Sequence, residues 1–383
     1  MQNYGSPELE FERGEGCYLF TYDGKRYLDF TMGIAVNSLG HCHPALVSVL
    51  QQQAQTLWHT SNLFRIRNAE TLAAALCKAS FADRVFFSNS GTEAIECAIK
   101  LCRRYFHNKG QSSRKRIICL GEAFHGRTLA ALAAAGNAAH CEGYLVGDSG
   151  FDHAPFGDIH AMRQLVGEET AGILLEPVQG EGGIRVAADD YLLAIKALCK
   201  EKGILLLLDE VQCGAGRTGT LYAHEQLGLT PDILATAKGL GGGFPVGACL
   251  ATEEVASVFQ PGTHGSTFGG NPLAMAVANR VLQELTSDTF LDTVRQRGDT
   301  LRATLQQLID RYPEHLDRVD GLGLMLGLYC KSDAAELGRR LQQAGLLVVK
   351  AGQNSIRLLP PLNVTESEIE EAANFLDTVL AAW

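Results

Sequence analysis

Asp209 and Lys238 are the two residues of this sequence whose types and surroundings most strongly indicate chemistry. Asp209 follows the apolar run of residues 204–208, and Lys238 follows the apolar segment of residues 232–237 and precedes several glycines. A run of this kind that ends in acids is typical of a strand buried on both faces, so Asp209 is expected where that strand meets solvent. In a parallel sheet both side chains would lie at the carboxyl edge, where open α/β sheets bind ligands.

One cofactor chemistry uses such a pair directly. A lysine that condenses with an aldehyde as a Schiff base, together with a carboxylate that holds a proton on a pyridine nitrogen, makes pyridoxal phosphate an electron sink. For an isolated pair the simpler alternative is stronger: Asp209 would cap the following turn and Lys238 would be a solvated strand end. Motifs elsewhere in the chain are needed to distinguish the cofactor site from this simpler alternative.

The same stretch contains a competing pattern. The glycines within residues 214–219 match GxGxxG, which marks dinucleotide-binding sites when it directly follows a strand. The match is weak because residues 209–213 separate the strand from the first glycine. Gly228 and Pro231 also interrupt the following segment before it could form a long helix. A nicotinamide site is therefore the less favoured interpretation.

A phosphate site is expected at the start of the helix that follows Ser90. Ser90 and Glu93 fit a capping box, which would be a sufficient explanation for an isolated motif. Beside a lysine and an aspartate arranged for a phosphorylated cofactor, phosphate binding becomes at least an equal alternative. The backbone N–H groups of Gly91 and Thr92, the helix dipole and the Thr92 hydroxyl would then hold the phosphate.

Three further side chains that follow predicted strands, and one that lies within a strand, suit the same site. Phe124 could pack flat on a planar ring and Arg127 could grip a carboxylate, although core packing and surface exposure are the simpler alternatives. Glu181 stands among glycines, so an arginine partner is expected for it. Arg357 alternates with apolar neighbours in a late strand and is expected to point towards the larger part of the chain.

Strands alternate with helices between about residues 84 and 285, which predicts a mainly parallel sheet covered by helices. Residues 14–30 indicate a hairpin at the amino-terminal end. Beyond residue 285 the pattern changes to long helices and short strands, and the last helix begins at Thr365 with a second capping box, to Glu368. We therefore expect a large α/β domain and a separate α+β unit.

The composition limits the possible functions. The 383 residues are 46% hydrophobic and 20% charged, which suits a globular chain with more than one domain, and the net charge of −10 argues against nucleic acid or an anionic membrane as partner. Eleven cysteines without a CxxC pair favour free thiols over disulfides, and no metal is predicted because His41, Cys42 and His43 lack further ligands at zinc spacing. Without a secretory signal, the expected location is the cytoplasm.

Six motifs resemble those of the class III pyridoxal-phosphate aminotransferases and occur in the same order. The resemblance extends from about residue 11 to the end of the chain. The motifs are SGTEA at residues 90–94, FHGR at 124–127, EPVQGEG at 176–182, DEVQ at 209–212, AKG at 237–239 and GSTFGGNP at 265–272. The resemblance implies an α/β chain of fold type I, with a large domain built on a mainly parallel seven-stranded sheet between helices and a smaller α+β domain from the two chain ends. The implied bounds are 1–45 for the N-terminal segment of the small domain, 46–285 for the large domain and 286–383 for the C-terminal small domain.

The resemblance also implies a role for each matching residue in a homodimer with shared active sites. Lys238 corresponds to the Schiff-base lysine and Asp209 to the partner of the pyridine nitrogen. The resemblance further implies that Gln212 lies near the ring hydroxyl of the cofactor and that Val211 and Phe124 lie on the two ring faces. It implies that Gly91 and Thr92 bind the phosphate, and that Thr267 binds the phosphate held by the partner subunit. The implied substrate residues are Ser266, Arg127, Arg357 and Glu181.

Within the family, residues 33–37, 40–44 and 57–62 resemble most the branch that acts on N2-acetylornithine. That branch implies a ping-pong transfer of the terminal amino group to 2-oxoglutarate in arginine biosynthesis. Arg127 would then meet the distant carboxylate of the donor, and Arg357 the carboxylate beside the reacting carbon of 2-oxoglutarate, while Glu181 occupies Arg357 during the first half-reaction. Succinylornithine, succinyldiaminopimelate, ornithine and 4-aminobutyrate stay open as alternative donors.

Overall fold

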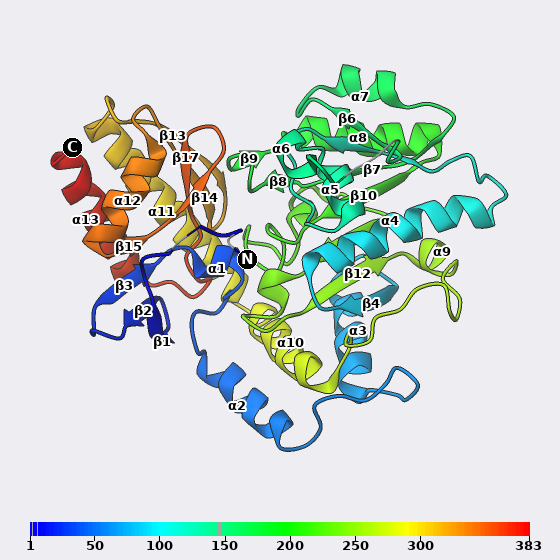
Figure 1. Cartoon of the computed structure of the whole chain (residues 1–383), viewed down its shortest axis with the longest axis horizontal. Coiled ribbons are helices and arrows are strands. Elements are labelled where there is room, and N and C mark those ends of the chain that lie inside the picture. The colour runs from blue at the N-terminus through cyan, green and yellow to red at the C-terminus, as the bar shows by residue number, and fades with distance from the viewer. Residues whose placement is uncertain (2, 6, 145–147) are drawn as a thin grey trace.

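The computed structural model describes residues 1, 3–5, 7–144 and 148–383 and consists of two lobes, which lie left and right in Figure 1. The right lobe holds a seven-stranded sheet between helices. The left lobe holds two four-stranded sheets and the last three helices. This is the α/β architecture with a smaller α+β unit that the sequence predicts.

The large sheet has the strand order β4-β12-β11-β10-β7-β5-β6. Strand β12 is antiparallel to both of its neighbours, and the other pairs are parallel, so the predicted mainly parallel seven-stranded sheet is confirmed. The strands are β4 (Arg84–Ser88), β5 (Arg116–Leu120), β6 (Phe151–Ala154), β7 (Thr170–Leu175), β10 (Leu205–Asp209), β11 (Ile233–Thr236) and β12 (Gly247–Ala251).

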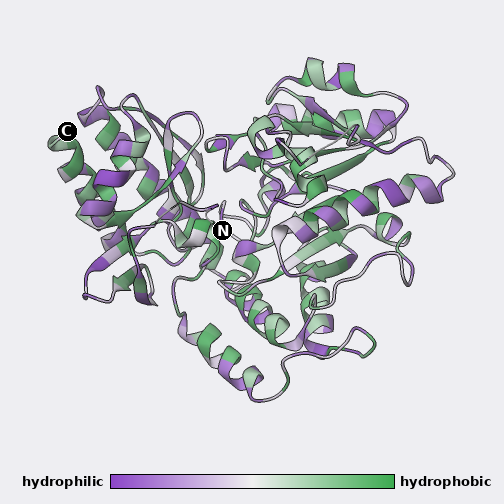
Figure 2. Ribbon diagram, in the orientation of Figure 1, coloured by the Kyte–Doolittle hydropathy of each residue, from purple (hydrophilic) through white to green (hydrophobic). Residues whose placement is uncertain are grey.

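Helices cover both faces of this sheet, and for that reason its central strands are buried throughout and consist mainly of apolar residues. In β10, Leu205 and Leu207 pack in the cluster that contains helix α4, whereas Leu206 and Leu208 pack in the cluster that contains helix α8. Figure 2 shows the strands in green, while the helices that cover them carry both green and purple residues. The alternation along β10 therefore fixes which side chains face which helix layer.

The right lobe has these helices: α3 (Arg67–Ala79), α4 (Gly91–Asn108), α5 (Leu129–Ala135), α6 (Ala138–Cys141), α7 (Ile159–Leu165), α8 (Asp189–Lys202), α9 (Glu253–Ala256) and α10 (Pro272–Leu285). Helix α10 packs against α3 and against α2 (Pro44–Ala54), which lies at the lower edge of Figure 1. Two 3-10 turns, η1 (Ala223–Leu227) and η2 (Lys238–Leu240), and a short hairpin of β8 (Val178–Gln179) and β9 (Arg185–Val186) complete the lobe.

The left lobe joins the two ends of the chain. One sheet has the order β13-β14-β17-β16, with β13 (Leu316–Leu322), β14 (Met325–Cys330), β17 (Ser355–Leu358) and β16 (Val349–Ala351). The other contains β1 (Phe11–Glu15), β2 (Tyr18–Thr21), β3 (Arg26–Asp29) and β15 (Leu346–Leu347), and β15 runs parallel to β3 with Leu346 opposite Leu28. The division into folding units at residues 45 and 285 stays a prediction.

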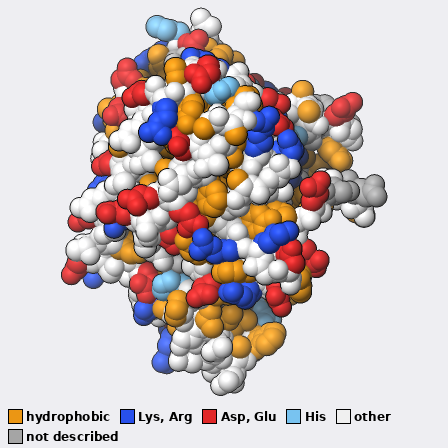
Figure 3. Space-filling view, turned by 90° about the vertical axis from the view of Figure 1, so that its left-hand side faces the viewer, with side chains coloured by type: hydrophobic (Ala, Val, Ile, Leu, Met, Phe, Trp, Pro, Cys, Tyr) orange, Lys and Arg blue, Asp and Glu red, His pale blue; other side chains and the backbone are white. Residues whose placement is uncertain are grey.

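The helices of the left lobe are α11 (Phe290–Arg311), α12 (Ala334–Ala344) and α13 (Glu366–Ala381). The predicted capping box between Thr365 and Glu368 is present at the start of α13. Acidic and basic side chains are interspersed over the face of this lobe in Figure 3. In the described part of the chain, no helix has the length and apolarity needed to cross a membrane.

A left-handed turn follows β3 and leads the chain towards the centre of the molecule. All four residues of α1 (Met32–Ala35) have positive φ, between 46° and 63°, although three of them are not glycine. Each such residue costs roughly 1–2 kcal/mol. The buried Asp29 holds the turn, because its Oδ1 accepts hydrogen bonds from the N–H groups of Thr31 at 2.7 Å and Met32 at 3.1 Å.

Candidate active site

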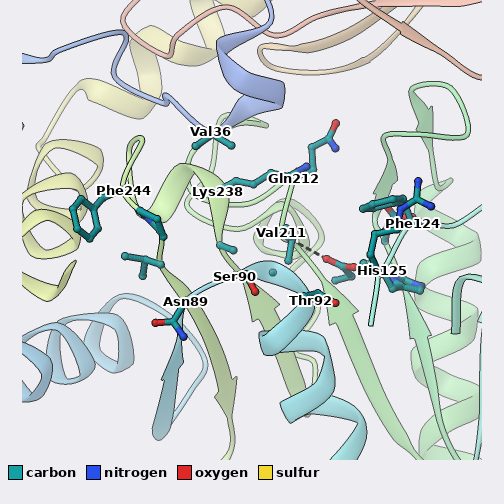
Figure 4. A pocket seen from close by; sticks show the side chains of 18 of the residues that line it. Val36, Asn89, Ser90, Thr92, Phe124, His125, Val211, Gln212, Lys238 and Phe244 are labelled. Carbon is teal, nitrogen blue, oxygen red and sulfur yellow. Dashed lines mark hydrogen bonds and ion pairs between the residues drawn. The ribbon is translucent and has the colours of Figure 1, made fainter. Parts of the chain in front are cut away.

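One cavity of about 390 Å³ lies where β4, β10 and β11 end. Figure 4 shows Lys238 and Gln212 above Val211, with the start of the helix that carries Thr92 below it and Phe124 with His125 to one side. The predicted site residues that line the cavity are Gly91, Thr92, Phe124, Arg127, Asp209, Val211, Gln212 and Lys238. Side chains that are far apart in the sequence therefore converge on one space.

Asp209 is buried, not at the solvent boundary where the sequence suggested it would lie. Its side chain is 3% exposed, because the segment after β5 covers the end of β10 and places His125 Nδ1 2.7 Å from Asp209 Oδ2. Asp209 Oδ1 accepts a hydrogen bond from the Val211 N–H at 3.0 Å. Burial lowers the pKa of His125, but the hydrogen bond to Asp209 and the charges of Asp209 and Glu176 outweigh it and raise that pKa overall.

Glu176, which follows β7, is the second buried carboxyl group of this cavity. Its Oε2 accepts a hydrogen bond from the Phe124 N–H at 3.2 Å. Burial raises the pKa of Glu176 to about 7, with the charge of His125 opposing the rise and that of Asp209 adding to it. The raised pKa lets Glu176 carry a proton near neutral pH while Asp209 keeps its contact with His125.

Lys238 has a strained backbone and a weakly basic amine. Its φ is +42°, in the left-handed region, and the hydroxyl of Ser38 donates to the carbonyl of the next residue, Gly239, at 2.8 Å. Burial and then the charge of Arg357 lower the pKa of Lys238 to about 8, against the opposing charges of nearby carboxylates. A larger fraction of this amine is therefore neutral, and able to attack an aldehyde, than is usual for lysine.

The amino-terminal end of α4 leaves two N–H groups for a ligand. Ser90 Oγ accepts a hydrogen bond from the Glu93 N–H at 3.3 Å, as the predicted cap requires, but the Glu93 carboxylate binds the N–H of Asn89 at 2.7 Å. The cap therefore does not use the N–H groups of Gly91 and Thr92. A Cβ on Gly91 would lie 2.6 Å from a methyl carbon of Val211, so only glycine keeps this space open.

Arg357 and Glu181 lie next to the cavity as a pair. Arg357 Nη1 donates to Glu181 Oε1 at 2.8 Å and to Gln212 Oε1 at 3.2 Å. The Arg357 side chain is 1% exposed, and within the described part of the chain its Nε has no hydrogen-bond partner. The expected arginine partner of Glu181 is thus Arg357, which reaches from β17 of the left lobe to residues of the right lobe.

Arg127 lies at the exposed edge of the cavity. Its guanidinium carbon is 5.5 Å from the centre of the Phe124 ring, and its Nη2 is 3.3 Å from His140 Nε2. Ser266 and Thr267 do not line the cavity. Ser266 Oγ accepts a hydrogen bond from Asn89 Nδ2 at 3.3 Å, whereas Thr267 is exposed on the outer surface.

Some site residues were not identified from the sequence. His125 and Glu176 belong to two of the quoted motifs, FHGR and EPVQGEG, so their signal was present without a role. Ser38 and Asn89 carried no such signal, because their contacts depend on chain segments about 200 residues away. Among the described residues, no group of three or more His, Cys, Asp or Glu side chains is placed to hold a metal ion.

The site has the donors that pyridoxal 5′-phosphate (PLP) needs: an amine, a buried carboxylate and free helix N–H groups. The family model of the class III aminotransferases matches residues 1–380. The chain belongs to this family, whose members use PLP, and the predicted resemblance is confirmed.

Within this family, the chain is similar to acetylornithine and ornithine aminotransferases. The chain is 52% identical over 379 residues to acetylornithine aminotransferase 1 of Bradyrhizobium diazoefficiens, covering 99% of this chain and 94% of that protein. The structure of N-acetylornithine aminotransferase from Stenotrophomonas maltophilia superposes with a TM-score of 0.87 at 36% identity, over 100% of this chain and 98% of the other. An ornithine aminotransferase structure from Toxoplasma gondii, with PLP in its active site at partial occupancy, gives 0.94 at 31% identity, over 100% and 92% of the two chains.

We expect Lys238 in the PLP-free protein to react with aldehydes at a lower pH than the exposed lysines do. Reductive methylation with formaldehyde, read by mass spectrometry of the Lys238 peptide, should accelerate about tenfold per pH unit and level off near pH 8, because only the neutral amine reacts.

Arg357→Gln is the matched control, since removal of this cation raises the pKa of Lys238 and moves the midpoint to higher pH. Exposed lysines such as Lys350 give the reference rate in the same digest. A Lys238 profile that coincides with that of the exposed lysines would contradict the lowered pKa.

Proposed function

We propose that this enzyme transfers the terminal amino group of N2-acetyl-L-ornithine to 2-oxoglutarate. The products are N-acetylglutamate 5-semialdehyde and L-glutamate, as in arginine biosynthesis. The observation that carries the proposal is the pair of Arg357 and Glu181 beside the cavity that contains Lys238. The names of the relatives at about 50% identity support the donor.

PLP supplies an aldehyde that amines attack and a pyridine ring that takes up the electron pair of the reacting carbon. In the proposal, the N–H groups of Gly91 and Thr92 hold its phosphate. Val211 and Phe124 would lie on the two faces of the ring, and Gln212 would lie near its hydroxyl. All of these residues line the same cavity, which supports the assignment.

Asp209 is proposed to keep the pyridine nitrogen protonated. One of its oxygens is engaged with His125 and the other with a backbone N–H, so the carboxylate has a fixed orientation and remaining lone pairs. This fixed orientation lets Asp209 accept a hydrogen bond from a protonated pyridine nitrogen.

Lys238 is proposed to move the proton of the reacting carbon. With a pKa of about 8, its amine is close to the operating pH, where a general base is most effective. The strained backbone at Lys238 and the bond from Ser38 to Gly239 fix the point from which the side chain extends.

The two substrates present their carboxylates at different places. The acetylornithine carboxylate is far from the reacting amine and suits Arg127 at the exposed edge of the cavity. The carboxylate beside the keto group of 2-oxoglutarate suits the buried Arg357, whose fork binds such groups in a bidentate manner. Glu181 neutralises Arg357 while the donor, which has no carboxylate there, occupies the site.

N2-acetylornithine should bleach the visible absorbance of the purified holoenzyme, and 2-oxoglutarate should restore it. Ornithine and 4-aminobutyrate, added in parallel, should react at least about tenfold more slowly, because a site built for one polar group rejects analogues that leave it unpaired. If only 4-aminobutyrate or ornithine bleached the absorbance, the amino donor would be that of another branch of the family, which would contradict this proposal.

Arg357→Gln should lower the rate of the 2-oxoglutarate half-reaction by about 10²-fold or more, because it leaves one carboxylate without its charged partner. The acetylornithine half-reaction should change far less. Both are measured as single turnovers of the PLP absorbance.

Arg127→Gln is the matched control and should show the opposite pattern. Equal losses in both half-reactions of Arg357→Gln would refute this division of roles. A Glu181→Ala variant that keeps the preference for terminal over α-amino groups would refute the role of Glu181.

We also propose a homodimer in which Thr267 reaches the phosphate of the partner subunit's site. The loop that carries Thr267 joins a second loop, since Asn62 Nδ2 donates to Ser266 O at 2.7 Å and the rings of His59 and Phe268 are 5.2 Å apart. Large apolar side chains are exposed on these two loops: Leu57, Trp58, Leu63, Phe64 and Phe268. A cluster of this kind is typical of a protein interface.

Phe64→Glu should convert a dimer of the 41.3 kDa chain into monomers and weaken PLP binding, because it places a charge in the proposed interface and removes Thr267 from the partner's site. Light scattering gives the mass and the visible absorbance gives bound PLP. Leu193→Glu, at an exposed apolar position on α8, is the matched control and should stay dimeric. A wild-type monomer that binds PLP tightly would refute the shared site.

A cytoplasmic location is part of the proposal. All eleven cysteines are free, and eight of them are buried in the apolar clusters. Free thiols in this number suit a reducing compartment. Small molecules are the proposed partners apart from the second subunit.

A further inference from the structure

Arg217 is a buried cation without a charged partner in the described part of the chain. Its residue is 2% exposed, and its Nη1 donates to two backbone carbonyls, those of Leu324 at 3.0 Å and Pro360 at 2.5 Å. Its Nη2 has no hydrogen-bond partner among the residues that the structure describes. Burial of a guanidinium against neutral acceptors alone is unfavourable, so packing alone does not explain an arginine at this position.

The two carbonyls belong to neighbouring strands. Leu324 directly precedes β14, and Pro360 follows the end of β17 by two residues. These strands pair with Gly327 opposite Arg357, so one guanidinium holds both strands near the end of β17 that carries Arg357. The Leu324 N–H also donates to the carbonyl of Arg217 at 3.0 Å.

The backbone next to Arg217 packs closely against the turn that precedes β14. A Cβ on Gly323 would lie 2.7 Å from the carbonyl carbon of Thr218. Beyond Pro360, the Leu362 N–H donates to Ser38 O at 2.7 Å, and Ser38 Oγ donates to the carbonyl of Gly239 at 2.8 Å. The chain after β17 is thereby tied to the segment that follows Lys238.

Arg217 is also close in sequence to the site. It lies five residues after Gln212, whose Oε1 accepts a hydrogen bond from Arg357 at 3.2 Å. One segment of the right lobe, residues 209–217, therefore contains Asp209, a direct partner of Arg357 and the cation that holds the strand of Arg357.

We propose that Arg217 is a positioning residue for the amino acceptor: it fixes β17 so that Arg357 meets the carboxylate beside the keto group of 2-oxoglutarate at the right distance from Lys238. This inference rests on the proposed function of Arg357. The donor, whose carboxylate is assigned to Arg127, depends less on the position of β17. Lysine is a poor replacement for Arg217, because a compact ammonium group is more strongly hydrated than a guanidinium and does not reproduce its fixed planar geometry.

Arg217→Lys should lower the kcat/KM of the 2-oxoglutarate half-reaction by about 10- to 100-fold, since a misplacement of about 1 Å has effects of that order. The acetylornithine half-reaction should stay within about threefold of wild type. Calorimetric titration of the holoenzyme with glutarate, which has both carboxylates but no keto group, should show at least about tenfold weaker binding and gives a readout apart from turnover.

Asn363→Ala is the matched control. It removes a hydrogen bond from Asn363 Nδ2 to Leu39 O, 3.1 Å long, at the same junction but does not hold β14 or β17. Both half-reactions and glutarate binding should stay at the wild-type level. If Arg217→Lys yields no folded holoenzyme, Arg217→Gln, which keeps an NH₂ donor without the charge, makes the same test with the same expected selective loss.

The double variant with Arg357→Gln separates the possible outcomes. If Arg217 acts through Arg357, adding Arg217→Lys to Arg357→Gln should cause little further loss in the 2-oxoglutarate half-reaction. Additive losses, or equal losses in both half-reactions of Arg217→Lys alone, would overturn the inference and leave the proposed function intact. An unchanged 2-oxoglutarate half-reaction in Arg357→Gln alone would overturn the proposed function and this inference with it.

Discussion

The buried contact between Asp209 and His125 is the interaction on which the arrangement of the site depends. A carboxylate cut off from water is stable only with a charged or hydrogen-bonding partner, and here the partner comes from the segment after β5. Strand β7 lies between β5 and β10 and delivers Glu176 to the same place. His125, Glu176 and Asp209 thus lie at the carboxyl ends of three adjacent parallel strands, and their charges interact with one another. The sheet order, and not any single motif, brings these groups together.

The second requirement is that the two lobes meet at one side chain. Arg357 belongs to a sheet of the left lobe, yet its hydrogen-bond partners Glu181 and Gln212 belong to the right lobe. A charged partner stabilises a guanidinium buried in this way, and Glu181 at the tip of the β8–β9 hairpin supplies one. The position of this arginine is therefore a property of the junction between the lobes, which the bonds from Arg217 and Ser38 define.

Much of the right lobe was predictable because its strands are buried on both faces and are continuously apolar, as β10 is. The cavity residues that follow those strands were predictable for the same reason, since parallel strands end at one edge. Exposure was not: Asp209 was expected at the solvent boundary, but the segment with His125 covers it. The roles of His125, Glu176 and Arg217 depend on which strands are neighbours, and no local pattern encodes that order. Thr267 lies outside the cavity of its own chain, so its role remains a prediction about a second chain.

The parallel pairing of β3 with β15 sets an order for folding during synthesis. Strand β3, which contains Leu28, can pair with β15 only after Leu346 has been synthesised, roughly 300 residues later in the chain. At about 5–20 residues per second, the ribosome needs roughly 15–60 s to make that length. The seven-stranded sheet, whose strands lie between residues 84 and 251, is complete before then. The amino-terminal strands β1, β2 and β3 therefore keep one open sheet edge for the whole interval, although every strand of the seven-stranded sheet has already been synthesised.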